Sequence, residues 1–240
     1  MKEVQGKLWK KPKSPTIVAG FPGFGLVSTI ATGFIIDHLK CEQIGKFWFE
    51  DLVPTLAVHN CSLVDPISVH YNKEYNLVIV HSIAPIQGNE WRAADLIIKI
   101  AKELKAKEVL TTEGVGSTES QDTKGFFYTS NPAHRKRFEK IGVDCLGEGI
   151  IVGVTCALLL KAPSEKIDVC SLFAETHSNL PDAKAAAKII ELLDKYLGLE
   201  IDYAPLLKQA QEFEQKLKGI LEQAQKAKAA KFKKDISYVG

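Results

Sequence analysis

Short apolar runs alternate with amphipathic segments between Thr16 and Leu197. The runs are rich in β-branched residues and have the length of strands, and residues 76–83 are continuously apolar, as in a strand buried on both faces. The amphipathic segments repeat apolar residues about every three to four positions, which predicts helices. We expect strands at 16–19, 46–49, 56–69 (interrupted near Asp65 and Pro66), 76–83, 109–112 and 168–175, and helices at 26–39, 90–104, 131–141 and 181–197.

Strands that alternate with helices predict an α/β fold in which a mainly parallel or mixed sheet is flanked by helices. Asn131 and Pro132 suit the cap and the first position of one helix. Pro181 and Gly198 suit the start and the stop of another. Residues 149–161 are nearly all apolar and fit either a buried helix or a strand, and their glycines, Gly149 and Gly153, suggest close packing against a neighbouring element.

A different pattern follows Asp202. Apolar residues recur at alternating spacings of four and three, an a/d seam that predicts a C-terminal helical arm: Leu206, Ala210, Phe213, Leu217, Ile220, Ala224 and Ala227. Such a helix packs either on its own domain or, in the manner of a coiled coil, on another subunit or partner. We favour the second interpretation, because the seam is narrow and flanked by charge. The sequence therefore predicts an α/β domain over 1–203 and a helical arm with a basic tail over 204–240.

Composition narrows the class of protein. The 240 residues are 45% hydrophobic and 25% charged, with a formal net charge of +2, so no whole-chain field marks a nucleic-acid binder. No stretch approaches the roughly 18 apolar residues that span a bilayer. The polar N-terminus lacks a signal sequence, which favours a cytoplasmic protein. An odd number of cysteines without CxxC spacing predicts free buried thiols and neither disulfides nor a metal or other cofactor: Cys41, Cys61, Cys145, Cys156 and Cys170.

The first candidate site is the glycine loop, Gly20-Phe-Pro-Gly-Phe-Gly25, which lies between a predicted strand and a predicted helix. Backbone amides and a helix N-terminus could bind an anion there. The spacing of Gly20, Gly23 and Gly25 matches neither standard nucleotide-binding fingerprint. A tight structural turn and an anion site both remain open, and we favour the turn.

The second candidate site is Glu113-Gly-Val-Gly-Ser-Thr-Glu119, at the carboxyl end of a predicted strand, where α/β proteins place their ligands. Glu113, Ser117 and Glu119 could bind a sugar or act as acid and base, although a flexible polar loop is the favoured interpretation. No nucleophile elbow is present, and the histidines, His134 among them, are scattered, which is typical of structural or surface roles. Together the two glycine-rich segments support an alternative function, a nucleoside- or sugar-phosphate-binding enzyme.

Four segments, taken together, resemble the archaeal branch of the proteasome assembly chaperone family. They are Thr16-IVAGFPGFGLVSTIATGF-Ile35, Glu113-GVGS, Gly147-EGIIVGVTCALLL and Pro181-DAKAAAKIIELLDKYLGLEID-Tyr203. The resemblance implies an α/β domain similar to purine nucleoside phosphorylases and a non-catalytic, homo-oligomeric role in protein assembly. Its implied partners are other copies of this chain and proteasome subunits. The lack of a long apolar stretch argues against a membrane partner, and the low net charge argues against nucleic acid, for which the lysines after Gln225 are the one candidate contact.

The C-terminal end departs from the family pattern by one position. Members that dock on proteasomes are similar in a tail of hydrophobic residue, tyrosine and any final residue, whereas this chain ends Ile236-Ser-Tyr-Val-Gly240. Tyr238 therefore stands third from last instead of second from last. We expect Ile236 and Tyr238, with Phe213, Leu217 and Ile220 of the arm, to contact partners or other subunits.

Overall fold

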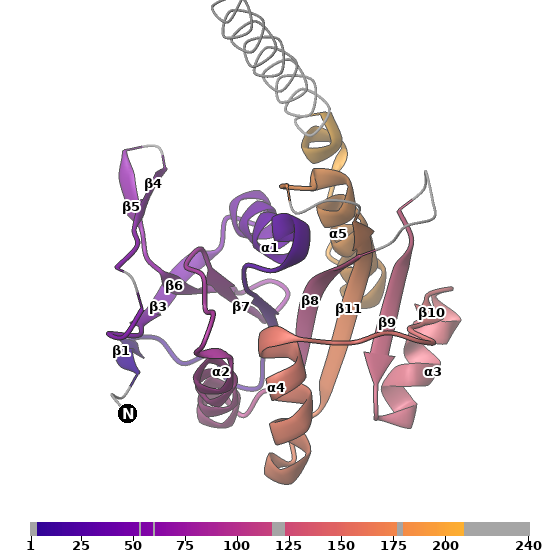
Figure 1. The fold of residues 1–240 in the computed structure, drawn as a ribbon, viewed down its shortest axis with the longest axis horizontal. Coiled ribbons are helices and arrows are strands. Elements are labelled where there is room, and N and C mark those ends of the chain that lie inside the picture. The colour runs from indigo at the N-terminus through magenta and orange to yellow at the C-terminus, as the bar shows by residue number, and fades with distance from the viewer. Residues whose placement is uncertain (1–3, 53, 60, 117–122, 177–179, 209–240) are drawn as a thin grey trace, which may run out of the picture. The chain divides into compact units, whose positions relative to one another are not determined.

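The computed structural model describes residues 4–52, 54–59, 61–116, 123–176 and 180–208 (Figure 1). The chain divides into two compact units, 1–202 and 203–240. Of the second unit the structure describes a helical turn at 204–208. The remaining arm and tail positions, including Phe213, Leu217, Ile220, Ile236 and Tyr238, lie outside the described residues, as does Ser117. Their predicted roles remain predictions.

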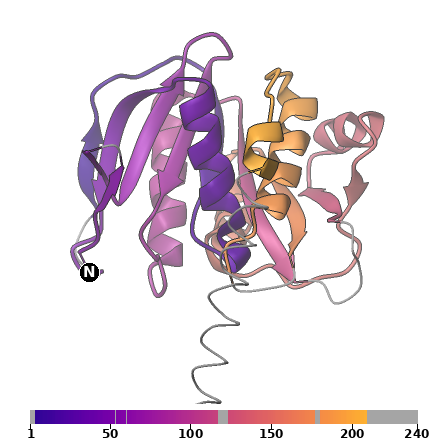
Figure 2. The same cartoon turned by 90° about the horizontal axis from the view of Figure 1, so that it is seen from above.

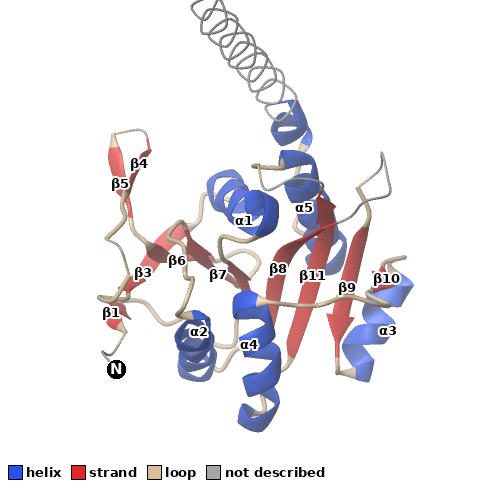
Figure 3. Cartoon of the chain, in the orientation of Figure 1, coloured by secondary structure: helices blue, strands red, loops and turns tan. Residues whose placement is uncertain are grey.

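The first unit is built on a mixed nine-stranded sheet (Figure 3). Its parallel centre is β7-β2-β8-β11, and β1, β3 and β6 extend one side in antiparallel pairs. On the other side β9 runs antiparallel to β11 and parallel to β10. In sheet order the strands are β1 (Gln5–Leu8), β3 (Glu42–Trp48), β6 (Ile67–Asn72), β7 (Leu77–Ser82), β2 (Thr16–Gly20), β8 (Glu108–Gly116), β11 (Val169–Thr176), β9 (Gly125–Thr129) and β10 (Asp144–Cys145).

Helices cover both faces of the sheet (Figure 2). Helices α1 (Val27–His38) and α5 (Ala183–Leu197) pack together on one face, and α2 (Glu90–Leu104) and α4 (Gly153–Lys161) pack together on the other. Helix α3 (Pro132–Lys140) packs against β9 and β10. Short 3-10 turns occupy Phe24–Leu26 and Ala162–Glu165. No helix in the described ranges combines the length and apolar character that a membrane crossing needs.

The burial of the central strands accounts for the apolar runs in their sequences. All six residues of β7 are buried, because this strand lies between β6 and its parallel neighbour β2, packs against α1, and contributes Val78 and Val80 to the core cluster that includes α2. Helix α2 presents Leu96, Ile100 and Leu104 to the core, as their spacing predicts. The expected α/β fold with a mixed sheet flanked by helices is confirmed. A separate two-stranded hairpin, β4 (Ala57–His59) and β5 (Ser62–Val64), precedes β6.

Helix ends follow the sequence with one exception. The Asn131 side chain accepts a hydrogen bond from the backbone N–H of Ala133, with Pro132 at the first position. Gly198, at φ 69°, ends α5. The predicted start of that helix at Pro181 is wrong, because Asp182 is its cap and accepts from the N–H of Ala185.

Several further expectations are wrong. Strand β8 continues to Gly116 because it pairs with β11 along its length, so Glu113 lies in a strand and not in a loop. The sequence pattern predicts none of the strands β1, β9 and β10. Within 149–161 the helix begins only at Gly153, and the glycines there make no contact closer than 3.5 Å for an added Cβ. Of the free cysteines only Cys170 is buried.

Candidate functional site

A cavity of about 850 Å³ lies at the carboxyl ends of the central parallel strands. The chain leaves β2 toward β3, β6 and β7, and it leaves β8 toward β9, β10 and β11, so the strand order reverses between these two neighbours. This reversal is where open α/β sheets place their ligands. The cavity is lined by the glycine loop, by residues 111–116 of β8, and by residues 146–152, the segment between β10 and α4 that we call the strap.

The glycine loop packs directly on β8. A Cβ added at Gly114 would lie 2.4 Å from the carbonyl oxygen of Phe24, so only glycine allows the two backbones to approach this closely. Gly25 has φ 64°, a conformation that side chains disfavour. The structure thus supports the interpretation of the loop as a tight turn. It also places Gly23 beside Glu113, because an added Cβ there would lie 3.6 Å from Glu113 Oε1.

Glu113 is the largely buried acid of this cavity. Burial raises the pKa of its carboxyl from 4.5 to about 7, and a hydrogen bond with the Thr155 hydroxyl partly opposes that rise. Thr155 lies in the first turn of α4, so the start of this helix brings the hydroxyl to the acid. The second carboxyl oxygen, Oε2, is buried without a hydrogen-bond partner among the described residues. A carboxyl in this state can hold or release a proton near neutral pH, or pair with a donor that enters the cavity.

The charges around the cavity share one sign. Glu90, Glu148 and Glu175 line it together with Glu113, and its described lining contains no lysine, arginine or histidine. Carboxylates repel a phosphate, and the described lining residues supply no positive charge to bind one. The nucleoside- or sugar-phosphate alternative therefore has no electrostatic support from the described lining. Ser117 and Glu119, the other residues named for that alternative, lie outside the described residues.

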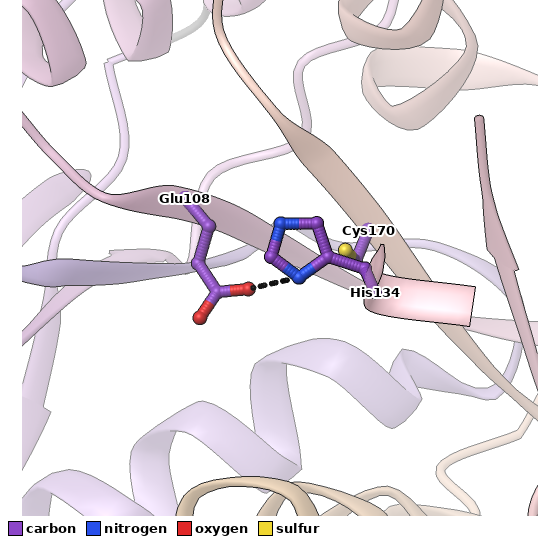
Figure 4. A group of neighbouring side chains, drawn as sticks. All are labelled: Glu108, His134 and Cys170. Carbon is purple, nitrogen blue, oxygen red and sulfur yellow. Dashed lines mark ion pairs between the residues drawn. The ribbon is translucent and has the colours of Figure 1, made fainter. Parts of the chain in front are cut away.

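A second polar cluster, drawn in Figure 4, lies at the amino ends of β8 and β11, whereas the cavity lies at their carboxyl ends. The sequence pattern did not predict this cluster. Donor atoms of Glu108, His134 and Cys170 all lie within 4.8 Å of one another, the spacing of a metal site. The ring nitrogen Nδ1 of His134 lies 3.3 Å from Glu108 Oε2, the ion pair drawn in the figure. These residues come from β8, α3 and β11, and their scatter along the chain gave no signal.

The atoms of Glu108 and His134 that could bind a metal are already engaged in hydrogen bonds. The Tyr196 hydroxyl of α5 donates to Glu108 Oε2 at 2.8 Å and accepts from His134 Nδ1, also at 2.8 Å. The Arg137 guanidinium stacks on the Tyr196 ring at 3.8 Å. Burial raises the pKa of the Cys170 thiol to about 12, which disfavours the thiolate that binds metals. The cluster is therefore best explained as a polar network that attaches α3 and α5 to the sheet.

The β4–β5 hairpin exposes large apolar side chains. Leu56, Val58 and Leu63 are 57%, 70% and 68% exposed. A groove of about 490 Å³ lies beside them, with Trp48 and Leu52 in its lining. A group of exposed apolar side chains next to an apolar groove is typical of a protein-contact surface.

The fold and sequence are similar to those of proteins from archaea. PbaA of Pyrococcus furiosus, described as an archaeal homolog of proteasome-assembly chaperone, is 27% identical, with 95% of each chain covered and a TM-score of 0.83. PbaB of the same organism, described as an archaeal proteasome activator, is 23% identical and shares the fold, with 92% of this chain and 99% of that chain covered and a TM-score of 0.79. The uncharacterized protein MJ0106 of Methanocaldococcus jannaschii is 28% identical over 214 residues, 88% of this chain and 87% of its own.

These comparisons confirm the resemblance to archaeal proteasome assembly chaperone homologues that the four sequence segments indicated. The family model extends beyond those segments, from β2 through α5 and into the C-terminal region. Since that model matches residues 17–221, the chain belongs to the PAC2 family.

Proposed function

We propose that this protein is a non-catalytic, homo-oligomeric assembly chaperone that acts on proteasome subunits in the cytoplasm. The observation that carries the proposal is the similarity to PbaA over 95% of both chains, together with membership of the PAC2 family. The proposal includes a purine nucleoside phosphorylase-like arrangement of the domain. The parallel strands β7-β2-β8-β11, covered on both faces, support that part.

Two surfaces are proposed to bind protein. The first is the β4–β5 hairpin, whose exposed Val58 and Leu63 are cross-strand partners beside the apolar groove. The second is the arm, 204–240, whose seam at Phe213, Leu217 and Ile220 would associate with other copies of this chain. In this proposal Ile236 and Tyr238 of the tail contact the proteasome subunit.

Native mass spectrometry tests the oligomer and the client together. The protein is measured alone and after mixing with proteasome α subunits from the same source. We expect a defined homo-oligomer that takes up α subunits. An oligomer that leaves the α subunits unbound would contradict the chaperone role.

The arm is tested by Leu217→Asp, with Gln215→Asp as the matched control that adds the same charge off the seam. The first variant is expected to lower the oligomer mass and the second to leave it unchanged. Equal masses for the two variants would contradict a role of the seam in self-association.

The hairpin is tested by the double variant Val58→Glu and Leu63→Lys. The two changes keep opposite charges across the strand pair, so the hairpin retains a favourable pair while its apolar surface is removed. We expect the variant to keep the circular dichroism of the parent and to lose α-subunit uptake. Unchanged uptake would exclude this surface as the client contact.

A further inference from the structure

The walls of the cavity suit an apolar body that carries a positive charge. Phe21, Phe24, Phe126 and Phe173 line it, with Ile150 of the strap. Aromatic faces attract cations and also pack against aliphatic chains. A volume of about 850 Å³ lies in the range of cavities that hold small organic molecules. The cavity can therefore enclose a small ligand and not merely a water.

One oxygen of the acid inside the cavity lacks a hydrogen-bond donor. Glu113 Oε2 is buried and has no hydrogen-bond partner among the described residues, although an unpaired buried oxygen costs free energy. Two of its acidic neighbours differ in this respect. Glu90 accepts a hydrogen bond from the N–H of Gly88, and Glu175 accepts one from the N–H of Lys124. A ligand that supplies a hydrogen-bond donor to Glu113 would remove the cost.

The charge of the lining selects the kind of donor. Glutamates approach the cavity from α2, the strap and β11 as well as from β8, and the described lining residues include no basic side chain. A neutral hydroxyl could donate to Glu113 but would gain nothing from the negative charge of the other glutamates. An anion would be repelled by that charge. An ammonium group supplies three N–H donors and a compensating charge.

We propose that the cavity between the glycine loop, β8 and the strap binds a free aliphatic amine. Its ammonium group pairs with Glu113, and its carbon chain packs against the phenylalanine rings. The site is an addition to the proposed chaperone function and is independent of it, because it rests on Glu113 and the cavity lining alone.

The acid–base state of Glu113 supports the pairing. With its pKa raised to about 7, the carboxyl of the protein without ligand is partly protonated at neutral pH. A cation binds the ionised form, so amine affinity rises as the pH increases through this value. Glu90, Glu148 and Glu175 are the other titratable groups of the described lining that face the ligand. The amine itself keeps its charge to a pH of about 10.

Ligand-detected NMR with three molecules of the same carbon chain tests the charge preference: n-hexylamine, hexanol and hexanoate. We expect n-hexylamine to bind about tenfold more tightly than hexanol, and hexanoate most weakly. Glu113→Gln, which keeps the shape of the side chain, should weaken n-hexylamine by about tenfold and leave hexanol unchanged. Glu139→Gln on the exposed face of α3 is the matched control and should match the parent.

Several outcomes would overturn the proposal. Equal affinity for n-hexylamine and hexanol in the parent protein would do so whether or not any variant folds. Tighter binding of ribose phosphate than of n-hexylamine would favour the sugar-phosphate alternative. Tighter binding of a blocked lysine peptide than of n-hexylamine would identify the occupant as a protein side chain and not a free amine.

Discussion

The two glutamates of β8 show how differently one strand can use the same side chain. Glu108 begins the strand and Glu113 lies near its end, on the opposite face, since an odd spacing inverts the side chain. Glu108 accepts from the Tyr196 hydroxyl and lies close to His134 and to Arg137, whose nearest nitrogen is 3.8 Å away. Glu113 has only the Thr155 hydroxyl, and its Oε2 is unpartnered among the described residues.

The difference separates structure from binding. At the amino end of the strand the fold gives the acid a hydroxyl donor and two nearby basic side chains, and the result is a connection between helices and sheet. At the carboxyl end the fold buries an acid in a cavity and leaves one oxygen without a donor. The cluster around Glu108 resembles a metal site in its residue types, yet its role is structural. Glu113, which has no such cluster around it, is the candidate ligand contact.

The largest effect is expected from Gly114→Ala. A Cβ at this position meets the backbone oxygen of Phe24 at 2.4 Å, and a backbone atom cannot move aside as a flexible side chain can. We expect the free energy of unfolding to fall by about 3 kcal/mol, measured by urea denaturation. The same change should separate the glycine loop from β8 and abolish n-hexylamine binding.

Gly116→Ala is the matched control in the same strand. Its added Cβ would lie 3.6 Å from a ring carbon of Phe24, an ordinary contact. We expect a change within about 0.5 kcal/mol. Equal destabilisation by the two substitutions would mean that the close backbone approach at Gly114 is not what shapes the cavity.

A smaller loss is expected from Tyr196→Phe at the other end of β8. The change removes the hydroxyl that bridges Glu108 and His134 and leaves the buried carboxylate and the partly buried imidazole each short of a partner. We expect the free energy of unfolding to fall by about 2 kcal/mol, while n-hexylamine binding is unchanged. Tyr128→Phe, on an exposed residue of β9, is the control for loss of a hydroxyl and should be neutral. A loss of amine binding in Tyr196→Phe would contradict the separation of the two ends.

Much of the fold could be predicted because burial leaves a local pattern. The strand at 77–82 and the helix at 90–104 show it in their own residues. Strand β9 gave a weaker signal, since its Gly125-Phe-Phe-Tyr-Thr129 is short and follows a polar segment. Strand β10 has only two residues, too few to show a strand pattern, and it is defined by its pairing with β9. The glycines at the end of β8 predict a loop, whereas pairing with β11 extends the strand to Gly116.

The site could be predicted in part for a similar reason. Gly23 and Glu113 were identified because each follows an apolar run, where parallel strands bring their carboxyl ends together. Thr155 and Phe126 could not be, because they reach the cavity from elements whose position depends on the tertiary fold. The polar network of Glu108, His134 and Tyr196 is in the same class: each residue is ordinary in its own segment, and only the packing of α3 and α5 assembles them.

An effect of the opposite sign, and one confined to neutral and higher pH, is expected from Glu113→Gln in the absence of ligand. The native state holds a proton on Glu113 up to a pH of about 7, whereas the unfolded chain releases it near 4.5. Unfolding therefore releases a proton in this window, and the stability of the parent protein falls as the pH rises from 4.5 to about 7. Glutamine carries no such proton, so the variant should match the parent at low pH and exceed it by up to about 3 kcal/mol above neutrality.

Thermal and urea unfolding across this pH range measure the difference, with Glu139→Gln as the control for loss of one negative charge on an exposed surface. The control is expected to run parallel to the parent at every pH. Parallel curves for Glu113→Gln as well would mean that Glu113 is ionised at no cost. Its Oε2 would then have a donor from the protein or from solvent, and the argument for an amine in the cavity would lose its basis. The opposite result would be a stability difference between Glu113→Gln and the parent that grows with pH and disappears when n-hexylamine is added. It would show that the amine removes the free-energy cost of ionising Glu113.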